Sequence, residues 1–275
     1  HSGDRVCDVS VEAITHGVRY DRAAAPDAPP PTGDPVIRAD SGEALAGLLR
    51  STHLASRERI YRHYDCEVQG RAVLRPGEAD ASVFLPVEGC PLGVAVSVDG
   101  NPFYGLLDPY QGGANAVAES MRNVAAVGAT PWCLTDCLNY GNPEDPRVFR
   151  QFREGVRGIG DAAREIGLIG ETGVAVPIVS GNVSLYNQSA RGRAIPPSPI
   201  VACFGIMPDY SVCITPAFKR DGNRVLLLGP RRKELGGSAL YRWAGVEGGT
   251  PPRVAVLRDR KSVVSGKSVD LGGRR

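Results

Sequence analysis

Polar residues end an apolar stretch in the segment TDCLNYGNPEDP (135–146). Asp136 lies near the end of the predicted strand 132–139, and asparagine, glycine and proline form a turn directly after it. Strand ends of this kind are where α/β-type folds place ligands for metal ions and phosphates. The same residues also allow a structural role, in which Asp136 caps a neighbouring helix or orders the turn.

A second polar strand end occurs in VSGNVSLYN (179–187). Gly181 has no side chain, so backbone N–H groups can approach a phosphate closely there, while Asn182 and Ser184 supply neutral oxygens. Neutral oxygens suit a Mg²⁺ ion that already carries phosphate ligands. A hairpin turn shaped by asparagine is the alternative, and this segment taken by itself favours that turn.

The segment 98–119 contains a third set of polar residues. Asp99 and Asp108 flank a stretch with aromatic residues and proline, and Gly112-Gly113 lead into a predicted helix. The N-terminus of such a helix could receive an anion. A loop and a Gly-Gly helix entry without any ligand is the other interpretation.

Other signals for catalysis are missing from the sequence. SGKS (265–268) does not complete a phosphate-binding P-loop, because Lys261 stands where glycine is required. The four histidines all lie at or before position 63, which excludes a histidine-based nucleophilic triad within the main body. The seven cysteines form no CxxC pair, which argues against a zinc site or a secreted disulfide framework and favours a reducing compartment.

Alternating strands and helices must position these polar segments. The apolar runs predict strands at 92–100, 132–139, 174–182 and 199–207, and helices at 113–129 and 145–166. In the second helix, apolar residues recur at alternating steps of three and four. We also expect strands within 4–20 and at 223–230. A proline-rich stretch at 23–35 and a break near 208–218 mark two boundaries between units.

The composition excludes several classes of protein. The 275 residues include 32 Lys or Arg and 30 Asp or Glu, and 42% are hydrophobic, as in a globular chain long enough for about two domains. Residues 259–275 hold five basic and two acidic side chains, so the part before them has no basic excess with which to bind nucleic acid. No apolar run approaches the roughly 20 residues that a membrane span needs.

Seven segments follow one another in the order found in one enzyme family. They are YRHYDCEVQG (61–70), LDPYQGGANAVAESMRNVAAVGATP (107–131), LTDCLNYGNPEDP (134–146), VSGNVSLYN (179–187), IPPSPIV (195–201), TPAFKRDGN (215–223) and ELGGS (234–238). Over about residues 36–240 the chain resembles phosphoribosylformylglycinamidine synthase, in particular its ATP-dependent large (synthetase) subunit. SGNVSLYN also argues against other superfamily members, such as a kinase or a selenophosphate synthetase.

The resemblance implies an α+β fold. Members contain two tandem copies of a unit similar to aminoimidazole ribonucleotide synthetase. Each copy has a four-stranded, mainly antiparallel sheet with flanking helices, which pairs with its counterpart, and then a mixed α/β domain. By resemblance, 1–22 end a preceding domain, 23–35 form a linker, 36–208 form the second N-terminal domain and 209–258 form part of a C-terminal domain. The basic tail 259–275 departs from the family, and we expect the chain to be part of a longer protein.

The implied reaction is the ATP-driven amidation of formylglycinamide ribonucleotide to formylglycinamidine ribonucleotide in purine biosynthesis. The formamide oxygen is phosphorylated, and ammonia then displaces the phosphate. The resemblance implies ATP and Mg²⁺ as cofactors, a glutaminase subunit and a small bridging subunit as partners, and a cytoplasmic location.

Four residues take roles by the same resemblance. Asp136 and Gly181 contact ATP, Asn182 binds Mg²⁺, and Ser184 contacts the substrate. We expect the Asp136 and Asn182 side chains to converge on one metal-bound triphosphate.

No catalytic residue is expected in this chain, because the family's catalytic histidine belongs to the first copy. The isolated chain is therefore expected to be inactive. The alternative is a non-catalytic half that retains a nucleotide for stability. The chain departs from the family pattern at two places. Phe103 stands where relatives usually carry arginine, and the stretch 168–177 is longer than the short turn that usually precedes SGNVS.

Overall fold

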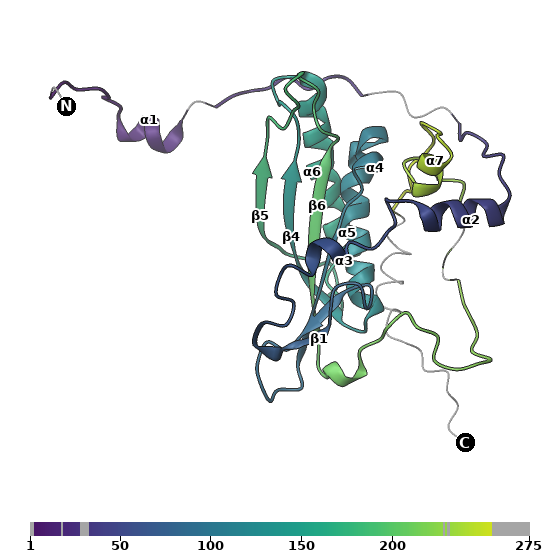
Figure 1. The fold of residues 1–275 in the computed structure, drawn as a ribbon. Helices are drawn as coiled ribbons and strands as arrows, with labels where there is room; N and C mark the ends of the chain where they lie inside the picture. Colours follow the sequence, from purple (N-terminus) through teal and green to yellow (C-terminus); the bar gives the residue numbers. More distant parts are fainter. Residues whose placement is uncertain (1–2, 18, 28–32, 228, 230–231, 255–275) are drawn as a thin grey trace.

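The computed structural model describes residues 3–17, 19–27, 33–227, 229 and 232–254 (Figure 1). The tail 259–275 lies outside these described residues. Of the helices in the described part, none combines the length and the apolar composition that a membrane crossing requires.

A six-stranded sheet forms the centre of the described structure. Its strands are β1 (Ala72–Leu74), β2 (Ser82–Phe84), β3 (Gly93–Asp99), β4 (Thr130–Asn139), β5 (Ile178–Ser184) and β6 (Ser198–Met207). They lie in the order β1-β2-β3-β6-β4-β5, and every neighbouring pair is antiparallel except β4 and β5. The expected α+β class is confirmed. The sheet exceeds the four expected strands because the short β1 and β2 extend it beyond β3.

Helices cover one face of this sheet. The described helices are α1 (Val11–His16), α2 (Ser41–Arg50), α3 (Glu58–Tyr61), α4 (Pro102–Leu107), α5 (Pro109–Ala126), α6 (Pro146–Ile166) and α7 (Ala239–Trp243), with 3-10 turns at Val68–Gly70 and Tyr210–Val212. Figure 1 shows α4, α5 and α6 on the same side of β4 and β6. Helix α5 begins four residues before the predicted start, because Asp108 caps it by accepting a hydrogen bond from the Gln111 N–H at 3.1 Å.

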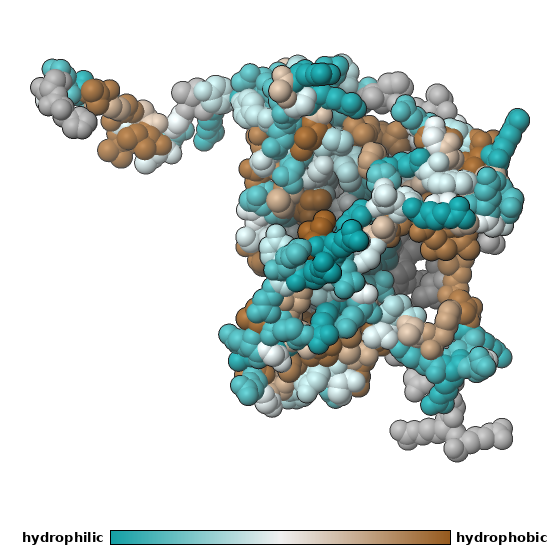
Figure 2. Space-filling view, viewed as in Figure 1, coloured by the Kyte–Doolittle hydropathy of each residue, from teal (hydrophilic) through white to brown (hydrophobic). Residues whose placement is uncertain are grey.

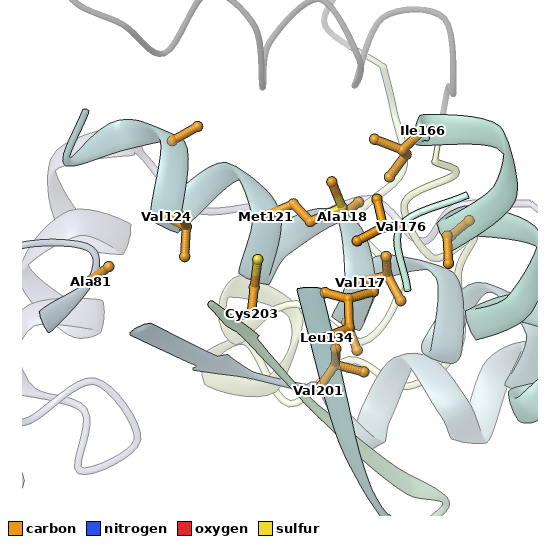
Figure 3. Close-up of a cluster of buried hydrophobic side chains, with 14 of the residues drawn as sticks. Ala81, Val117, Ala118, Met121, Val124, Leu134, Ile166, Val176, Val201 and Cys203 are labelled. Carbon is orange, nitrogen blue, oxygen red and sulfur yellow. The ribbon is translucent and has the colours of Figure 1, made fainter. Parts of the chain in front are cut away.

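The hydrophobic core lies between the sheet and helices α5 and α6 (Figure 3). Side chains alternate along β6, so that Val201 and Cys203 are buried beneath α5 while Phe204 is half-buried on the other face. On that other face, which is open at β3, Val98 is 63% exposed. The open face agrees with the sheet pairing that the resemblance implies.

The N-terminal segment corrects one expectation. Residues 4–20 contain helix α1 instead of the predicted strands. Ser10 caps the helix by accepting a hydrogen bond from the Ala13 N–H at 3.1 Å, and Gly17 ends it. Figure 2 shows apolar atoms on this protruding segment, where Val11 and Ile14 are more than 70% exposed.

The segment after the second boundary also differs from expectation. The described residues within 223–230 form no strand, and Val225, Leu226 and Leu227 are 78%, 66% and 73% exposed. An apolar segment becomes a strand only where a neighbouring strand supplies hydrogen bonds, and the described part of the chain places none beside it.

Candidate functional site

Strands β4 and β5 bring the two polar segments side by side. The strands are parallel, and their register pairs Asp136 with Gly181, Cys137 with Asn182 and Asn139 with Ser184. Residues that are far apart in the sequence therefore lie along two hydrogen-bonded strands, with β5 at the edge of the sheet.

The register also decides which way each side chain points. Paired residues of parallel strands face the same side, and successive residues alternate. Asp136 alternates with the buried Leu134 and Leu138 and so faces the helices, whereas Asn182 lies beside Cys137 on the open face. The expectation that the Asp136 and Asn182 side chains converge is therefore wrong. The roles of the single residues stay predictions.

The Asp136 carboxylate lies directly against the backbone of Gly181. A Cβ atom at Gly181 would be 2.5 Å from Oδ1 of Asp136, so only glycine leaves room for this approach. Burial raises the pKa of the Asp136 carboxyl group, because the charged form loses contact with water. No side chain in the described part donates a hydrogen bond to this carboxylate.

Ser184 is held in place by Asn187, which the sequence did not indicate as a site residue. The Asn187 Nδ2 donates to the Ser184 Oγ at 3.0 Å and to the Tyr140 carbonyl at 3.1 Å. The hydroxyl is thus fixed at the open-face side of β5, where a ligand at the sheet edge can reach it.

Asp99 belongs to a separate polar cluster on the helix-covered face. Its Oδ1 accepts a hydrogen bond from Asn123 Nδ2 at 2.9 Å, and the Ser97 hydroxyl donates to its other oxygen. Burial raises the pKa of Asp99, and burial together with the Asp99 charge raises the pKa of Glu119. Sequence reasoning missed Glu119 and Asn123, although their spacing of four residues places both on one face of α5.

The raised pKa of Asp99 predicts that the difference in stability between wild type and the variant Asp99→Asn depends on pH. When a carboxyl group has a higher pKa in the folded state than in the unfolded state, the folded protein loses stability as the pH rises. The loss begins near the unfolded pKa, about 4, and continues through the folded pKa. We expect Asp99→Asn, which cannot ionise, to become more stable relative to wild type across that interval. Urea unfolding of both chains between about pH 4 and 7 measures this difference. A difference that stays constant with pH would contradict it.

The departure at Phe103 has a structural counterpart. The Arg242 guanidinium of α7 lies over the Phe103 ring, 3.8 Å from its centroid. A guanidinium from another segment therefore occupies the neighbourhood of this aromatic ring. The contact also ties α7 to α4.

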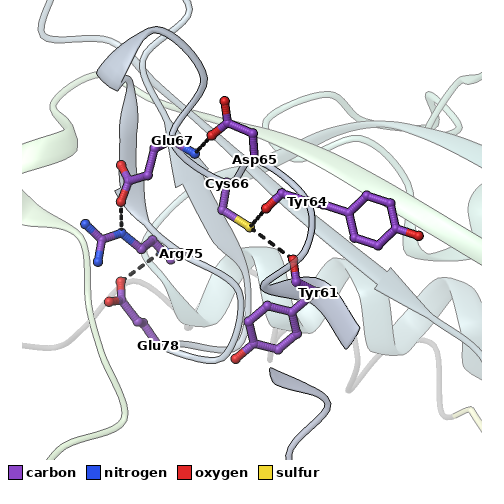
Figure 4. A network of polar contacts seen from close by, with 7 residues as sticks. All are labelled: Tyr61, Tyr64, Asp65, Cys66, Glu67, Arg75 and Glu78. Carbon is purple, nitrogen blue, oxygen red and sulfur yellow. Dashed lines mark hydrogen bonds and ion pairs between the residues drawn. The ribbon is translucent and has the colours of Figure 1, made fainter. Parts of the chain in front are cut away.

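The motif 61–70 forms a polar network of its own, seen in Figure 4. The Cys66 Sγ donates to the Tyr64 carbonyl at 3.5 Å, and the Arg75 backbone N–H donates to Glu78 at 2.8 Å. Arg75 also pairs with Glu67. Cys66 lines two hollows, and Asp136, Gly181, Asn182 and Ser184 line neither of them. The Arg75–Glu67 pair therefore links the segment before β1 to the turn after it.

Comparison with known proteins supports the resemblance. Residues 78–207 match the family model "AIR synthase related protein, N-terminal domain". Phosphoribosylformylglycinamidine synthase subunit PurL of Methanothrix thermoacetophila is 51% identical over 96% of this chain and 34% of its own length. The subunit of the same name from Thermus thermophilus is 41% identical over 94% of this chain and 35% of its own length.

Solved structures agree with this result. The structure described as T. maritima PurL complexed with ATP has a TM-score of 0.54 and 25% identity over 79% of this chain and 32% of that chain. The structure of PurLQS from Thermotoga maritima has a TM-score of 0.56 at 25% identity, over 78% of this chain and 32% of that chain. This chain thus spans about a third of the length of the curated relatives that it matches, such as the 34% of the Methanothrix protein. It belongs to the family of phosphoribosylformylglycinamidine synthase subunit PurL.

Proposed function

We propose that this chain contributes a Mg-nucleotide contact surface to an ATP-dependent synthase that amidates formylglycinamide ribonucleotide in purine biosynthesis. The observation that carries this proposal is the pairing of TDCLN with SGNVS as adjacent strands, in a chain 51% identical to a PurL subunit over nearly its full extent. A glutaminase subunit and a small bridging subunit would be its partners in the cytoplasm.

The geometry supports separate roles for the two faces of β5. Asp136 and the Gly181 backbone form the contact on the helix side, and Asn182 and Ser184 form the contact on the open side. Because β5 is the edge strand, a nucleotide seated along its free edge can reach both faces. We propose that Asp136 and Gly181 bind ATP, and that Ser184 binds the substrate.

The donors beside Asn182 fit a magnesium ion that carries phosphate ligands. Asn182, Asn139 and Ser184 offer neutral oxygens on the open side of two paired strands. In the described part of the chain, no group of three or more His, Cys, Asp or Glu is placed to hold a metal ion. The phosphates and another domain would therefore supply the remaining ligands. When bound, the ion would neutralise the charge that develops during phosphoryl transfer.

The second candidate function is a nucleotide site that stabilises the subunit without turnover. It is favoured by the absence of histidine from β4 and β5, since all four histidines lie at or before position 63. In that case Asp136 and Asn182 would hold the nucleotide without converting it.

A nucleotide titration of the whole chain tests the binding role. We expect wild type to bind Mg-ATP weakly. The affinity should be at least about tenfold lower for Asp136→Ala and for Asn182→Ala, because each substitution removes a side chain that contacts the nucleotide or its magnesium ion. Asn223→Ala, an exposed loop asparagine, is the matched control and should bind like wild type. Equal affinities in all four chains would contradict the assignment.

An amidation assay tests the expected inactivity of the chain on its own. We expect the chain alone to leave Mg-ATP unconverted in an amidation assay with formylglycinamide ribonucleotide and ammonia, because the resemblance places the catalytic histidine in another copy. Turnover by this polypeptide alone would contradict both the expected inactivity and the purely structural site.

A further inference from the structure

Asn187, the last residue of the segment VSGNVSLYN, joins the ends of strands β4 and β5. Its backbone N–H donates to the carbonyl oxygen of Tyr140, directly after β4, at 3.1 Å. Its side-chain Nδ2 donates to the same oxygen at 3.1 Å and to the Ser184 carbonyl oxygen, at the end of β5, at 2.9 Å. Because β5 is the edge strand and pairs with β4 alone, these contacts fix its polar end.

The backbone of Tyr186 turns Asn187 back toward the two strands. Tyr186 has a φ of 61°, and in the described part of the chain only Gln69 shares a positive φ among the residues other than glycine. A side chain disfavours this left-handed conformation, so the surrounding contacts must maintain it. One of them is the hydrogen bond from the Tyr186 backbone N–H to the Gly141 carbonyl oxygen, at 2.9 Å.

The contacts of Asn187 decide what the Ser184 hydroxyl can offer a ligand. Only the nitrogen of an amide can donate to carbonyl oxygens, so the contacts with Tyr140 and Ser184 identify Nδ2 and leave Oδ1 as the acceptor. The Ser184 hydroxyl donates its single hydrogen to this Oδ1 at 3.2 Å, and its Oγ accepts from Nδ2 at 3.0 Å. The Oγ therefore retains one free lone pair and no free hydrogen.

We propose that Asn187 is a positioning residue that presents the Ser184 Oγ to the substrate as a hydrogen-bond acceptor. The substrate group at Ser184 is then an N–H or O–H donor, from the amide of formylglycinamide or from the ribose. It is not the phosphate, which offers acceptors at neutral pH. This inference rests on the proposed function, because it requires the substrate to lie at Ser184.

A double-mutant cycle tests the coupling between the two side chains. Ser184→Ala, Asn187→Ala and the double variant are compared with wild type, all as the whole chain, by NMR titration with formylglycinamide ribonucleotide. We expect each single variant to bind about tenfold more weakly than wild type. The double variant should bind no more weakly than either single variant, because both substitutions remove the same contact.

Asn187→Asp separates the direction of the hydroxyl from the joining of the strands. Aspartate keeps an oxygen that accepts from the Ser184 hydroxyl, but it loses both amide hydrogens. This variant should unfold at a lower urea concentration than wild type and still bind the substrate more tightly than Ser184→Ala does. Affinity as low as in Ser184→Ala would overturn the positioning role, even if Asn187→Ala does not fold.

Two smaller probes identify the group that Ser184 contacts. Wild type and Ser184→Ala are titrated with ribose 5-phosphate and with inorganic phosphate. A loss of affinity for the substrate alone assigns the amide N–H, and a loss for ribose 5-phosphate as well assigns a ribose hydroxyl. Weaker binding of inorganic phosphate to Ser184→Ala would overturn the acceptor role.

Asn142→Ala is the matched control. Asn142 is also a half-buried asparagine in the turn after β4, but its Oδ1 accepts from the Glu144 backbone N–H at 2.8 Å. This variant should bind the substrate like wild type. If it loses as much affinity as Asn187→Ala, general loosening of the turn explains both losses and the positioning role is wrong.

The outcomes separate this inference from the proposed function. Wild-type affinity in Asn187→Ala, or losses that add in the double variant, would overturn the positioning role and leave the Ser184 contact standing. A wild-type chain that binds no formylglycinamide ribonucleotide would overturn the substrate contact of the proposed function, and the positioning role with it.

Discussion

Replacing Gly158 by alanine is expected to destabilise the folded chain by about 3 kcal/mol, the upper end of the usual cost of overpacking. Gly158 lies in α6 where this helix crosses α5. A Cβ atom there would be 2.0 Å from the Tyr110 carbonyl oxygen and 3.1 Å from the Ala114 backbone nitrogen. Both are backbone atoms, so no side chain can turn away, and the two helices would have to separate. Urea unfolding of the purified variant measures the loss.

Gly160→Ala is the control within the same helix. A Cβ at Gly160 would lie 3.4 Å from the flexible end of Arg164 and would meet no backbone of another element. Alanine favours helix over glycine by up to about 1 kcal/mol, so this variant should be as stable as wild type or more stable. If both alanine variants were destabilised to a similar extent, the loss would not come from the contact between α6 and α5 at Gly158, and the prediction would be contradicted.

Met121→Ala is expected to cost about 2–5 kcal/mol of folding free energy. Met121 is 0% exposed and projects from α5 toward the core, between the helix and the sheet (Figure 3). Its loss would leave a cavity that the surrounding strands and helices can only partly fill. Met121→Leu keeps most of the volume and should cost less than about 1.5 kcal/mol. A loss as large for leucine as for alanine would contradict the cavity argument.

Periodic segments were predicted well from the sequence. Helix α6 was expected at 145–166 and occupies Pro146–Ile166, because its apolar residues recur at helical spacing and Asp145 caps its start by accepting from the Arg147 N–H. Strand β6 was expected at 199–207 and occupies Ser198–Met207. Where local pattern and packing favour the same element, sequence is sufficient.

Other elements depend on neighbours or on short capping contacts. The segment 223–230 has the composition of a strand, yet its described residues pair with none. In residues 11–16, apolar and polar side chains do not alternate regularly enough to exclude a helix. The hydrogen bond that Ser10 accepts at the start of this segment favours the helix. In both cases the deciding contact lies outside the apolar pattern itself.

The sequence by itself determined which residues stand at the two polar strand ends, the family that they indicate, and the α+β class. Tertiary structure decided on which face each side chain lies. Between Leu134 and Thr135 the pairing partner on β5 advances from Ile178 to Ser180, so β5 contains one extra residue. Without this irregularity, Asn182 would pair with Leu138 and share the face of Asp136. Because side chains alternate with a period of two, a shift of one residue reverses the face, and only hydrogen bonding between strands sets that shift.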